Sequence, residues 1–395
     1  MKVVLVNTKV PGGAYVACQR LYHALKMQGV DVMFLEIKVT KWNFFWERFC
    51  IWVANRFSRK NLFAVSIANT GTDISKLQEV READIIHLHW INQGGLSLKN
   101  IEQLQALGKP IVWTMHDMWP FTGICHHAYD CTNFRSKCGS CHFLRQSSEH
   151  DISFTVLQQK NQICASIHFV AVSSWLQNKA EQSSLVHSIS TIPNVLDTSV
   201  FIIQDKQAAR RYYNLPESKN IILMGASKLN DPIKGFQYLR EALSYVAHPD
   251  NTCLCVFGAI KNDPSFLTNL PVDVIWLNRS FTLEELAKLY AAADVTVVAS
   301  LYETFGQTLS ESLACGTPVV SFDNSGQTDI VVHKKNGYLA KWKDARDLAM
   351  GIDSVLSTSF DAKELRKEAV SKYSESVVAN QYIALYQSLL TDHNI

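Results

Sequence analysis

Two glutamates, Glu303 and Glu311, lie eight positions apart in the segment SLYETFGQTLSESLACGTPVV. Between them, at the expected junction of a loop and a helix, stand Thr304, Phe305 and Gly306. The first amides of a helix are unpaired and lie at the positive end of the helix dipole, so they attract phosphate groups. A carboxylate accepts paired hydrogen bonds from the vicinal hydroxyls of a sugar. The segment therefore predicts a site for a sugar nucleotide, rather than an ordinary amphipathic helix with two solvated glutamates.

A lysine, Lys234, stands in the segment SKLNDPIKGF, shortly after a strand expected over residues 221–226. An ammonium group at that place can reach a pyrophosphate and neutralise the charge that develops as a nucleotide leaves. The alternative interpretation is a surface lysine ahead of a helix.

Three histidines lie at or near the ends of expected strands. His87 and His89, in IIHLHW, alternate along a strand and so point to one of its faces. They either line an acceptor site or pack in the core. His116 ends the strand IVWTM and is followed by Asp117, which makes it a candidate for contact with a substrate, the alternative being a histidine satisfied within the protein.

A cluster of four cysteines occurs in CHHAYDCTNFRSKCGSCHF: Cys125, Cys131, Cys138 and Cys141. Four thiolates suit a tetrahedral zinc ion, which would hold together a loop with few apolar residues. The alternative ligands are His126, His127 and His142. The other interpretations are free thiols in a reduced loop, disulfides, or a redox role. Four thiolates leave zinc no open position, so such a metal would be structural and not catalytic.

Aromatic and basic residues alternate in KWNFFWERFCIWVANRFSRKNLF, which spans residues 41–63. The aromatic residues recur at mixed spacings of three and four: Trp42, Phe45, Trp46, Phe49 and Trp52. The basic residues among them are Arg48, Arg56, Arg59 and Lys60. A helix of this composition is typical of the interface of a bilayer. The alternative is a helix that packs its aromatic face on a sheet.

The composition restricts the class of protein. A chain of 395 residues is long enough for two domains with full cores, and 47% hydrophobic with 19% charged residues indicates a globular protein. A net charge of +2 gives no reason to expect binding to nucleic acid. No apolar run approaches the ~20 residues of a membrane span. The opening MKVVLVNTKV predicts a strand and not a signal peptide, so we expect the cysteines in a reducing cytoplasm.

The elements that must position these residues alternate between strand and helix, which predicts an α/β fold with doubly wound parallel sheets. In the first half we expect a helix over Ala14–Gln28 and the strands Val3–Asn7, Asp31–Ile37, Ile85–His89, Ile111–Met115 and His168–Ser173. In the second half we expect a helix over Leu283–Ala292 and the strands Ile221–Ala226, Cys253–Gly258, Val274–Leu277, Val295–Ser300 and Val319–Phe322.

The segment around Glu303 and Glu311, with its flanking FG, ACGTPVV and the downstream NGYLA, resembles the donor-site signature of family 4 retaining glycosyltransferases. The resemblance covers nearly the whole chain, although its specific motifs concentrate in the second half. HDMWPFTG and the cysteine-rich insert are similar to bacterial exopolysaccharide, O-antigen and colanic-acid type members. The resemblance implies the GT-B fold, in which two Rossmann-like domains face each other across a cleft and a C-terminal helix crosses back to the first domain.

The domains expected from this resemblance follow the hinge pattern at Pro193-Asn194. An acceptor-side domain covers residues 1–194 and contains the cysteine-rich insert, 125–142, and the aromatic and basic segment, 41–63. A donor-binding domain covers residues 195–375. The crossover helix covers residues 376–395.

The same resemblance implies roles for individual residues. Glu303 would lie by the transferred sugar, Glu311 would hold the nucleotide ribose, and Lys234 would bind the pyrophosphate. His116 would face the transferred sugar, in a mechanism that lacks a clear nucleophile and in which the leaving phosphate helps to deprotonate the acceptor. Gly13, in the glycine loop Gly12-Gly13, would lie near the donor phosphates, although a plain tight turn explains it equally well.

The chain departs from the family at one place in the donor site. Many members carry an arginine after the first strand of the second domain, where this chain has Ala226-Ser227 with Lys228 nearby. Either Lys228 replaces the arginine or one phosphate contact is missing, and a lysine lacks the bidentate fork of a guanidinium group.

The function expected from the sequence is retaining transfer of a hexose from a nucleoside diphosphate sugar to a hydroxyl of a lipid-linked oligosaccharide, in the synthesis of a bacterial surface polysaccharide. No cofactor is expected for catalysis, and the enzyme would act in the cytoplasm at the inner face of the membrane. One alternative is a sugar-nucleotide epimerase of the same fold, but a soluble substrate gives no reason for the aromatic and basic segment. Another is a non-catalytic relative, which the presence of all the key residues argues against.

Overall fold

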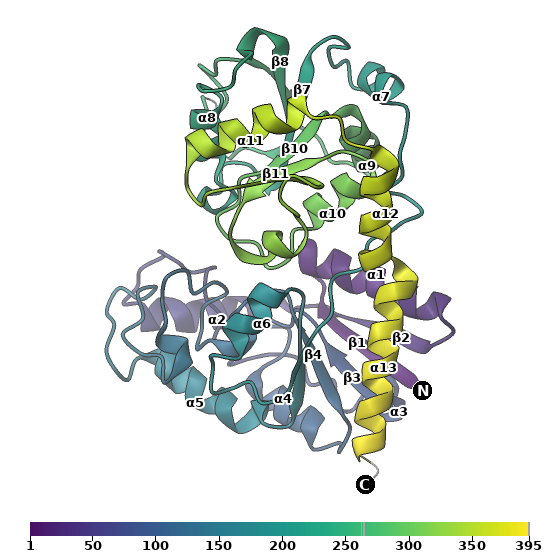
Figure 1. Cartoon of the computed structure of the whole chain (residues 1–395). Coiled ribbons are helices and arrows are strands. Elements are labelled where there is room, and N and C mark those ends of the chain that lie inside the picture. Colours follow the sequence, from purple (N-terminus) through teal and green to yellow (C-terminus); the bar gives the residue numbers. More distant parts are fainter. Residues whose placement is uncertain (262, 264, 394–395) are drawn as a thin grey trace. The chain divides into compact units, whose positions relative to one another are not determined.

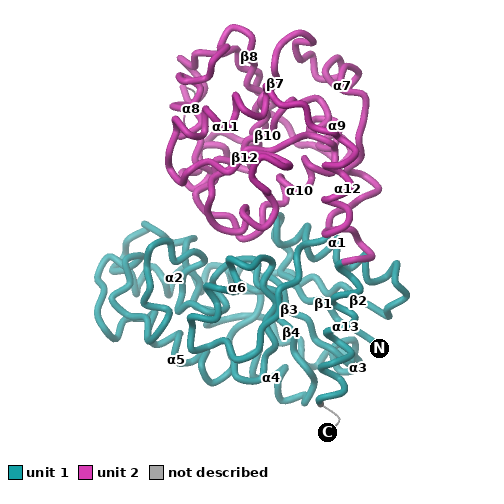
Figure 2. The backbone as a smooth tube through the Cα atoms, viewed as in Figure 1, with its two compact units in different colours: residues 1–195, 378–395 teal, residues 196–377 magenta. Residues whose placement is uncertain are grey.

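The computed structural model describes residues 1–261, 263 and 265–393, and these divide into two compact units (Figure 1, Figure 2). Unit 1 consists of residues 1–195 and 378–395, and unit 2 of residues 196–377. The domain boundary expected after residue 194 lies one residue from this division.

Unit 1 alternates strands and helices from its first residues. Its strands are β1 (Lys2–Thr8), β2 (Asp31–Ile37), β3 (Ile85–Leu88), β4 (Ile111–Met115), β5 (Ile167–Ala171) and β6 (Ile189–Thr191). Its helices are α1 (Gly13–Met27), α2 (Lys41–Ala54), α3 (Gln78–Glu82), α4 (Leu98–Gln105), α5 (Ile152–Cys164) and α6 (Ser174–Ala180). Within the described residues the strands form one parallel sheet in the order β2-β1-β3-β4-β5-β6.

Unit 2 repeats the pattern. Its strands are β7 (Asn220–Lys228), β8 (Thr252–Ala259), β9 (Asp273–Leu277), β10 (Val295–Val298), β11 (Val319–Phe322) and β12 (Gly337–Ala340). Its helices are α7 (Lys206–Tyr212), α8 (Phe236–Ala242), α9 (Leu283–Ala292), α10 (Gln307–Ala314), α11 (Ala345–Ser357) and α12 (Ala362–Tyr373). In the part of the chain that the structure describes, these strands also form a parallel sheet, in the order β12-β11-β10-β7-β8-β9.

The central strands of both sheets are continuous apolar runs because helices cover both of their faces. In β1, Val3 to Val6 are almost completely buried, and in β10 the four residues from Val295 to Val298 are buried as well. Local signals fix the helix ends: Thr282 and Glu285 form a reciprocal capping box at the start of α9. The fold class expected from the sequence is therefore confirmed. Two short strands, β6 and β12, were not expected.

The last helix, α13 (Glu375–His393), takes part in both units. Glu375 accepts hydrogen bonds from the backbone amide and the hydroxyl of Thr198, in unit 2. From Val378 onward the helix belongs to unit 1, where Tyr382 and Tyr386 are buried in the same core as β1 and α1. A helix that crosses back to the first unit was expected from the sequence.

Candidate active site

The strand order of unit 2 places a ligand site at one point of the sheet. Counted from β7, the order is 3-2-1-4-5-6, so the chain reverses its direction of winding between β7 and β10. In open parallel sheets, ligands bind beyond the carboxyl ends of the strands at such a point. The segments that follow β7 and β10 contain Lys234 and Glu303, so these two residues lie on either side of it.

An ion pair joins the two segments. Lys234 Nζ lies 2.6 Å from Glu303 Oε1, and both side chains are partly exposed. Burial lowers the pKa of Lys234, but Glu303 raises it, and the net effect is a pKa above the ordinary value. Lys234 is therefore an ammonium group at neutral pH. The pair presents one positive and one negative group beyond the carboxyl ends of the strands, where ligands bind in open parallel sheets.

Gly235, directly after Lys234, gives the loop its shape. Its φ of 66° lies in the left-handed region, and a Cβ there would overlap the carbonyl oxygen of Ala299, at the end of β10. Only glycine allows the loop to approach β10 this closely. The position of Lys234 against Glu303 thus depends on the residue that follows it.

The segment after β11 holds the backbone of Glu303 in place. The Glu303 amide donates to Ser325 Oγ at 2.9 Å, and the Gly326 amide donates to the Glu303 carbonyl at 2.8 Å. Asn324 Nδ2 donates to the carbonyl of Leu301 at 2.6 Å. No role for this segment was expected from the sequence. Its signal was the run DNSGQTD, which follows the buried strand VVSF with polar residues and a glycine.

Glu311 lies in the second turn of α10 and is only 6% exposed. Tyr290, from α9, donates its hydroxyl to Glu311 Oε2 at 2.9 Å. Burial and the nearby Glu311 raise the pKa of Tyr290 well above its ordinary value, so it remains a donor. This bond orients the carboxylate, and Tyr290 is a supporting residue that the sequence analysis missed.

The three residues before α10 differ in what they can offer a ligand. Gly306 precedes the helix with a φ of 105°, which disfavours any other residue. The Phe305 ring is buried against Tyr373, with 5.5 Å between the ring centroids, so only its backbone is available to a ligand. Thr304 lies beside Gly326, where a Cβ would overlap the Thr304 carbonyl. Lys228 is the half-buried last residue of β7, beyond an irregularity in its pairing with β8.

A group of buried histidines lies at the carboxyl ends of β3 and β4 in unit 1. His89 Nδ1 lies 2.9 Å from His116 Nε2, and the His87 and His89 rings are 4.3 Å apart. The pattern of alternation therefore correctly placed His87 and His89 on one face. His87 bonds to Tyr386 Oη at 2.7 Å and to Thr114 Oγ1 at 2.8 Å. His87 therefore packs against α13 and does not line an open site.

Burial keeps these histidines neutral. It lowers the pKa of His87 to about 3 and that of His116 to about 4, and it also lowers the pKa of His89 well below the ordinary value. In neutral imidazoles one nitrogen donates and the other accepts. The buried His89 Nε2 has no partner among the described residues, and an unpaired acceptor costs less than an unpaired N–H. In the pair His89 Nδ1–His116 Nε2, one neutral ring therefore donates to the other.

Asp117, beside His116, has partners within its own unit. Its Oδ2 lies 2.7 Å from His126 Nδ1 and accepts a bond from Trp90 Nε1 at 3.1 Å. The other ring nitrogen of His126 lies 3.0 Å from Ser66 Oγ. Burial raises the pKa of Asp117, but His126 outweighs this and holds the pKa below the ordinary value. Because both of its nitrogens are engaged here, His126 is not an alternative ligand for the cysteine cluster.

At the first turn from strand to helix, a Cβ on Gly12 or Gly13 would meet nothing within 4 Å. Gly12 has an extended backbone with a φ of 162°, which any residue adopts. Nothing within the protein itself therefore requires glycine at these positions, and the space in front of the first turn of α1 is open. The role of Gly13 at the donor phosphates stays a prediction.

The four cysteines of the insert, Cys125, Cys131, Cys138 and Cys141, line one cavity of about 20 Å³, together with His142. Burial raises the pKa of the Cys141 thiol to about 11 and also raises that of Cys138. The described residues contain no group of three or more histidine, cysteine or acidic side chains already arranged as metal ligands. Lys160, whose Nζ donates to the carbonyls of Trp119 and Thr122, is buried nearby. Zinc binding by these thiols stays a prediction.

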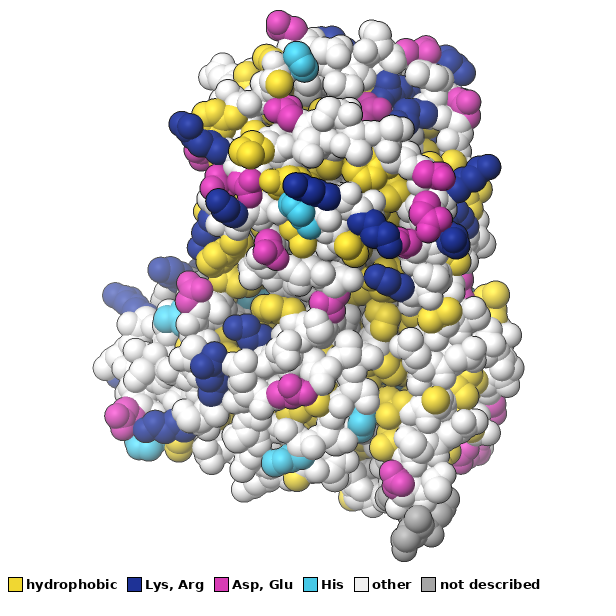
Figure 3. All heavy atoms as spheres, viewed as in Figure 1, with side chains coloured by type: hydrophobic (Ala, Val, Ile, Leu, Met, Phe, Trp, Pro, Cys, Tyr) yellow, Lys and Arg dark blue, Asp and Glu magenta, His cyan; other side chains and the backbone are white. Residues whose placement is uncertain are grey.

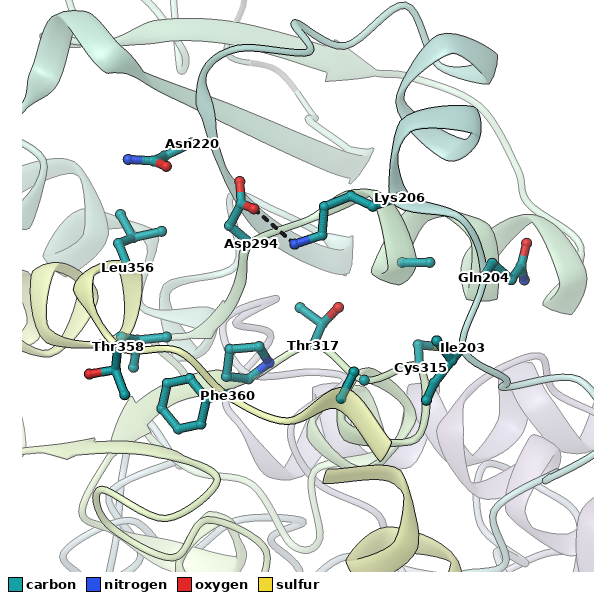
Figure 4. Close-up of a pocket in the computed structure, with 15 residues that line it drawn as sticks. Ile203, Gln204, Lys206, Asn220, Asp294, Cys315, Thr317, Leu356, Thr358 and Phe360 are labelled. Carbon is teal, nitrogen blue, oxygen red and sulfur yellow. Dashed lines mark hydrogen bonds and ion pairs between the residues drawn. The ribbon is translucent and has the colours of Figure 1, made fainter. Parts of the chain in front are cut away.

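A separate cavity of about 240 Å³ lies at the opposite edge of the sheet of unit 2 (Figure 4). Its lining includes Asn220, the first residue of β7, and Asp294 and Pro318, which directly precede β10 and β11. Lys206 Nζ is paired with Asp294 Oδ1 at 2.9 Å inside it. This cavity lies at the amino ends of the strands and is distinct from the site at Lys234 and Glu303.

Comparisons with known proteins agree with this geometry. The family model described as Glycosyltransferase Family 4 matches residues 11–200, and the model described as Glycosyl transferases group 1 matches residues 205–373. An uncharacterized glycosyltransferase of Methanocaldococcus jannaschii is 26% identical over 83% of this chain and 90% of its own length. The D-inositol 3-phosphate glycosyltransferase of Thermobispora bispora is 26% identical over 78% of this chain and 71% of its own length.

Among solved structures, the crystal structure of Anabaena HepE in complex with UDP and glucose has a TM-score of 0.64 to this protein. The match covers 98% of this chain and 100% of that one, at 16% identity, and so bears on the fold alone. The two family models together cover the two units that carry the sites at His116 and at Lys234 and Glu303. The chain is therefore a glycosyltransferase of the family 4 and group 1 type, with the GT-B fold.

Proposed function

We propose that this glycosyltransferase transfers a hexose from a nucleoside diphosphate sugar to a hydroxyl of a lipid-linked oligosaccharide, with retention of configuration. The observation that carries the proposal is the Lys234–Glu303 pair at the switch point of the unit 2 sheet, with the buried carboxylate of Glu311 on the next helix. One ammonium and two carboxylates at such a point match the three parts of the donor: pyrophosphate, sugar and ribose.

Each group has a distinct task in this proposal. Lys234 binds the pyrophosphate and stabilises the charge that develops on it as the bond to the sugar breaks. Glu303 binds hydroxyls of the transferred sugar, and Glu311 binds the ribose hydroxyls. His116, at the carboxyl end of β4, hydrogen-bonds the transferred sugar or stabilises the charge that develops on it. No divalent ion is required, because Lys234 and the amides before α10 supply the positive field.

The donor class is supported by the structural neighbour, because HepE was crystallised with UDP and with UDP-glucose. We therefore propose UDP-glucose as the first donor to test. The proposal of a lipid-linked acceptor is supported by α2, in unit 1, whose exposed aromatic and basic side chains suit an acceptor presented at a membrane. No helix in the described residues is long and apolar enough to cross a bilayer. We propose that the enzyme binds the inner face of the membrane as a peripheral protein.

The destination in a bacterial surface polysaccharide rests on the similarity of HDMWPFTG and the cysteine-rich insert to members of that kind. A second acceptor class is favoured by one comparison: the Thermobispora relative is named for D-inositol 3-phosphate, a small soluble acceptor. The two acceptor classes are tested in parallel by offering radiolabelled donor to membrane lipid extracts and to inositol phosphate.

The experiment that tests the proposed function is a thermal-shift and calorimetric screen of the full chain against nucleoside diphosphates and their sugars. We expect selective stabilisation by one nucleotide, and loss of that stabilisation in Lys234→Ala and Glu311→Ala. No binding across the panel would contradict the proposal. Nuclear magnetic resonance of the donor, incubated without acceptor, would reveal an epimerase by the appearance of a second sugar nucleotide.

A further inference from the structure

In helix α2 a pair of charged side chains faces the protein interior and several aromatic side chains face solvent, which is the reverse of an ordinary surface helix. Glu47 is completely buried and Arg48 is 5% exposed, whereas Trp42 is 71% and Phe45 65% exposed. A surface helix normally turns its apolar stripe to the core and its charges to water. Of the two arrangements that the sequence left open, packing of the aromatic face on the sheet is therefore wrong.

The buried charges hold the helix in this orientation. Glu47 Oε1 accepts hydrogen bonds from the amides of Ile67 and Ala68, at 2.8 and 3.0 Å. Arg48 Nη2 lies 3.1 Å from Glu47 Oε2, and Arg48 donates to the carbonyl of Val65 at 3.1 Å. These hydrogen bonds offset part of the cost of burying the ion pair, although among the described residues Glu47 Oε2 and Arg48 Nε form no hydrogen bond. The polar contacts thus fix the inner face of α2 and leave the aromatic side chains outside.

The exposed side chains form a continuous surface, which we call the aromatic surface: Trp42, Phe45, Trp46, Phe49, Phe57 and Phe63. Trp42 stacks on Trp46 with 5.7 Å between ring centroids, and Trp46 stacks on Phe49 at 5.8 Å. Single exposed apolar residues are common on proteins, but a contiguous group marks a binding surface.

The exposed charges in the stretch of chain that carries the aromatic surface are of one sign. Between residues 38 and 72 the only acidic residue is Glu47, which is buried. The exposed charged residues of that range are all basic: Lys38, Lys41, Arg56, Arg59 and Lys60. On the face of the molecule drawn in Figure 3, by contrast, acidic and basic side chains are intermixed. Within residues 38–72, the exposed charges that accompany the aromatic surface are therefore all positive.

We infer that the aromatic surface docks on a bilayer that contains anionic phospholipids, with α2 parallel to the membrane plane. Tryptophan favours the boundary between head groups and acyl chains, and lysine and arginine are attracted to anionic head groups. A second copy of the chain is a poorer partner, because a two-fold interface would bring the same basic residues face to face. The inference rests on the membrane location in the proposed function and deepens it, because it names the surface that binds the bilayer and the class of lipid that attracts it.

The test is co-sedimentation of the full chain with vesicles of phosphatidylcholine alone and of phosphatidylcholine with phosphatidylglycerol. We expect binding to the anionic vesicles, weakened by salt. The double variant Trp42→Ser/Phe45→Ser should bind at least about tenfold more weakly. The triple variant Arg56→Gln/Arg59→Gln/Lys60→Gln should lose about fivefold in affinity for each charge removed. Met350→Ser, which removes an exposed apolar side chain from unit 2, should bind like the wild type.

Each of three results would overturn the inference. The first is no binding to either kind of vesicle, and the second is that the wild type and the triple variant both bind the two kinds of vesicle equally well. The third is a dimer of the wild type that is absent in the double variant. Thermal stabilisation by UDP, measured on the same proteins in solution, separates this test from that of the proposed function. Variants that lose vesicle binding but keep the UDP shift support the docking surface. A wild type that binds vesicles but no nucleotide supports the docking surface and contradicts the proposed function.

Discussion

The two partners of the Lys234–Glu303 ion pair should respond to mutation with opposite signs in nucleotide binding. Lys234→Ala removes a charge-assisted bond to phosphate, worth about 1.5–3 kcal/mol, and leaves the Glu303 carboxylate without its partner at 2.6 Å. Repulsion between that carboxylate and the diphosphate adds about 1 kcal/mol. The sum of about 2.5–4 kcal/mol predicts that UDP binds about 70- to 900-fold more weakly.

Glu303→Gln removes the competitor for Lys234 and the negative charge beside the phosphates. Both side chains of the pair are partly exposed, 29% for Lys234 and 21% for Glu303, so the pair is worth only about 1 kcal/mol. UDP should then bind unchanged or up to about fivefold more tightly. Transfer should nevertheless fall by about 100-fold or more, because the transferred sugar loses its carboxylate.

The assay is isothermal calorimetry with UDP, combined with the turnover rate of radiolabelled donor. The double variant Lys234→Ala/Glu303→Gln should bind UDP better than Lys234→Ala alone, because the repulsion is gone. Lys206→Ala is a matched control, since Lys206 forms a comparable ion pair with Asp294 at the opposite edge of the same sheet and should leave UDP binding unchanged. Equal weakening of UDP binding by Lys234→Ala and Glu303→Gln would refute the reasoning and make the pair a structural clamp.

Three further predictions concern other parts of the structure. Glu311→Gln should weaken the binding of UDP about 10- to 100-fold in calorimetry, because the proposed partners of Glu311 are the ribose hydroxyls. The analogue 2′,3′-dideoxy-UDP lacks these hydroxyls, so its weaker binding should be the same in the variant and the wild type; equal losses of affinity for both nucleotides would contradict the assignment. The pKa values of His87 and His116 lie at about 3 and about 4 when folded, below the ordinary ~6.5, so the unfolded chain binds more protons between these limits. The free energy of unfolding in urea should thus rise from pH 4 to pH 6.5, by up to about 1.4 kcal/mol per pH unit for each buried histidine. The variant His87→Gln should show a smaller rise, whereas the control variant His23→Gln, at an exposed position, should show the same rise as the wild type. Cys138→Ser/Cys141→Ser should lower the melting temperature and release one zinc ion per chain, whereas Cys50→Ser should do neither; a wild type without zinc by elemental analysis would end the metal hypothesis.

The sequence predicted the longer buried strands well, because each of them is a continuous run of apolar residues. It missed β6 and β12, because Ile189–Thr191 is short and half-exposed and Gly337–Ala340 contains only four residues. Hydrophobic periodicity carries too little signal over such lengths.

The sequence predicted the candidate donor-site residues one by one, but it did not predict the residues that hold them in place. Tyr290 lies 21 positions before Glu311, and Ser325 lies 22 positions after Glu303. Such contacts depend on the order of strands in the sheet, which local pattern does not specify. The orientation of α2 was likewise undecided, because it is set by hydrogen bonds from Glu47 to the backbone of a distant segment.

The crossover of α13 has a consequence for the order in which this protein is made. Tyr382 Oη lies 2.9 Å from Thr114 Oγ1 and Tyr386 Oη lies 2.7 Å from His87 Nδ1, so the last helix completes the core of the first unit. A ribosome synthesises unit 1 up to residue 195 and then all of unit 2 before it reaches these tyrosines. Domains usually fold from the N-terminus as they emerge. Here the first unit cannot complete its core until α13 has been synthesised, and only then can His87 and Thr114 form their hydrogen bonds with Tyr386 and Tyr382.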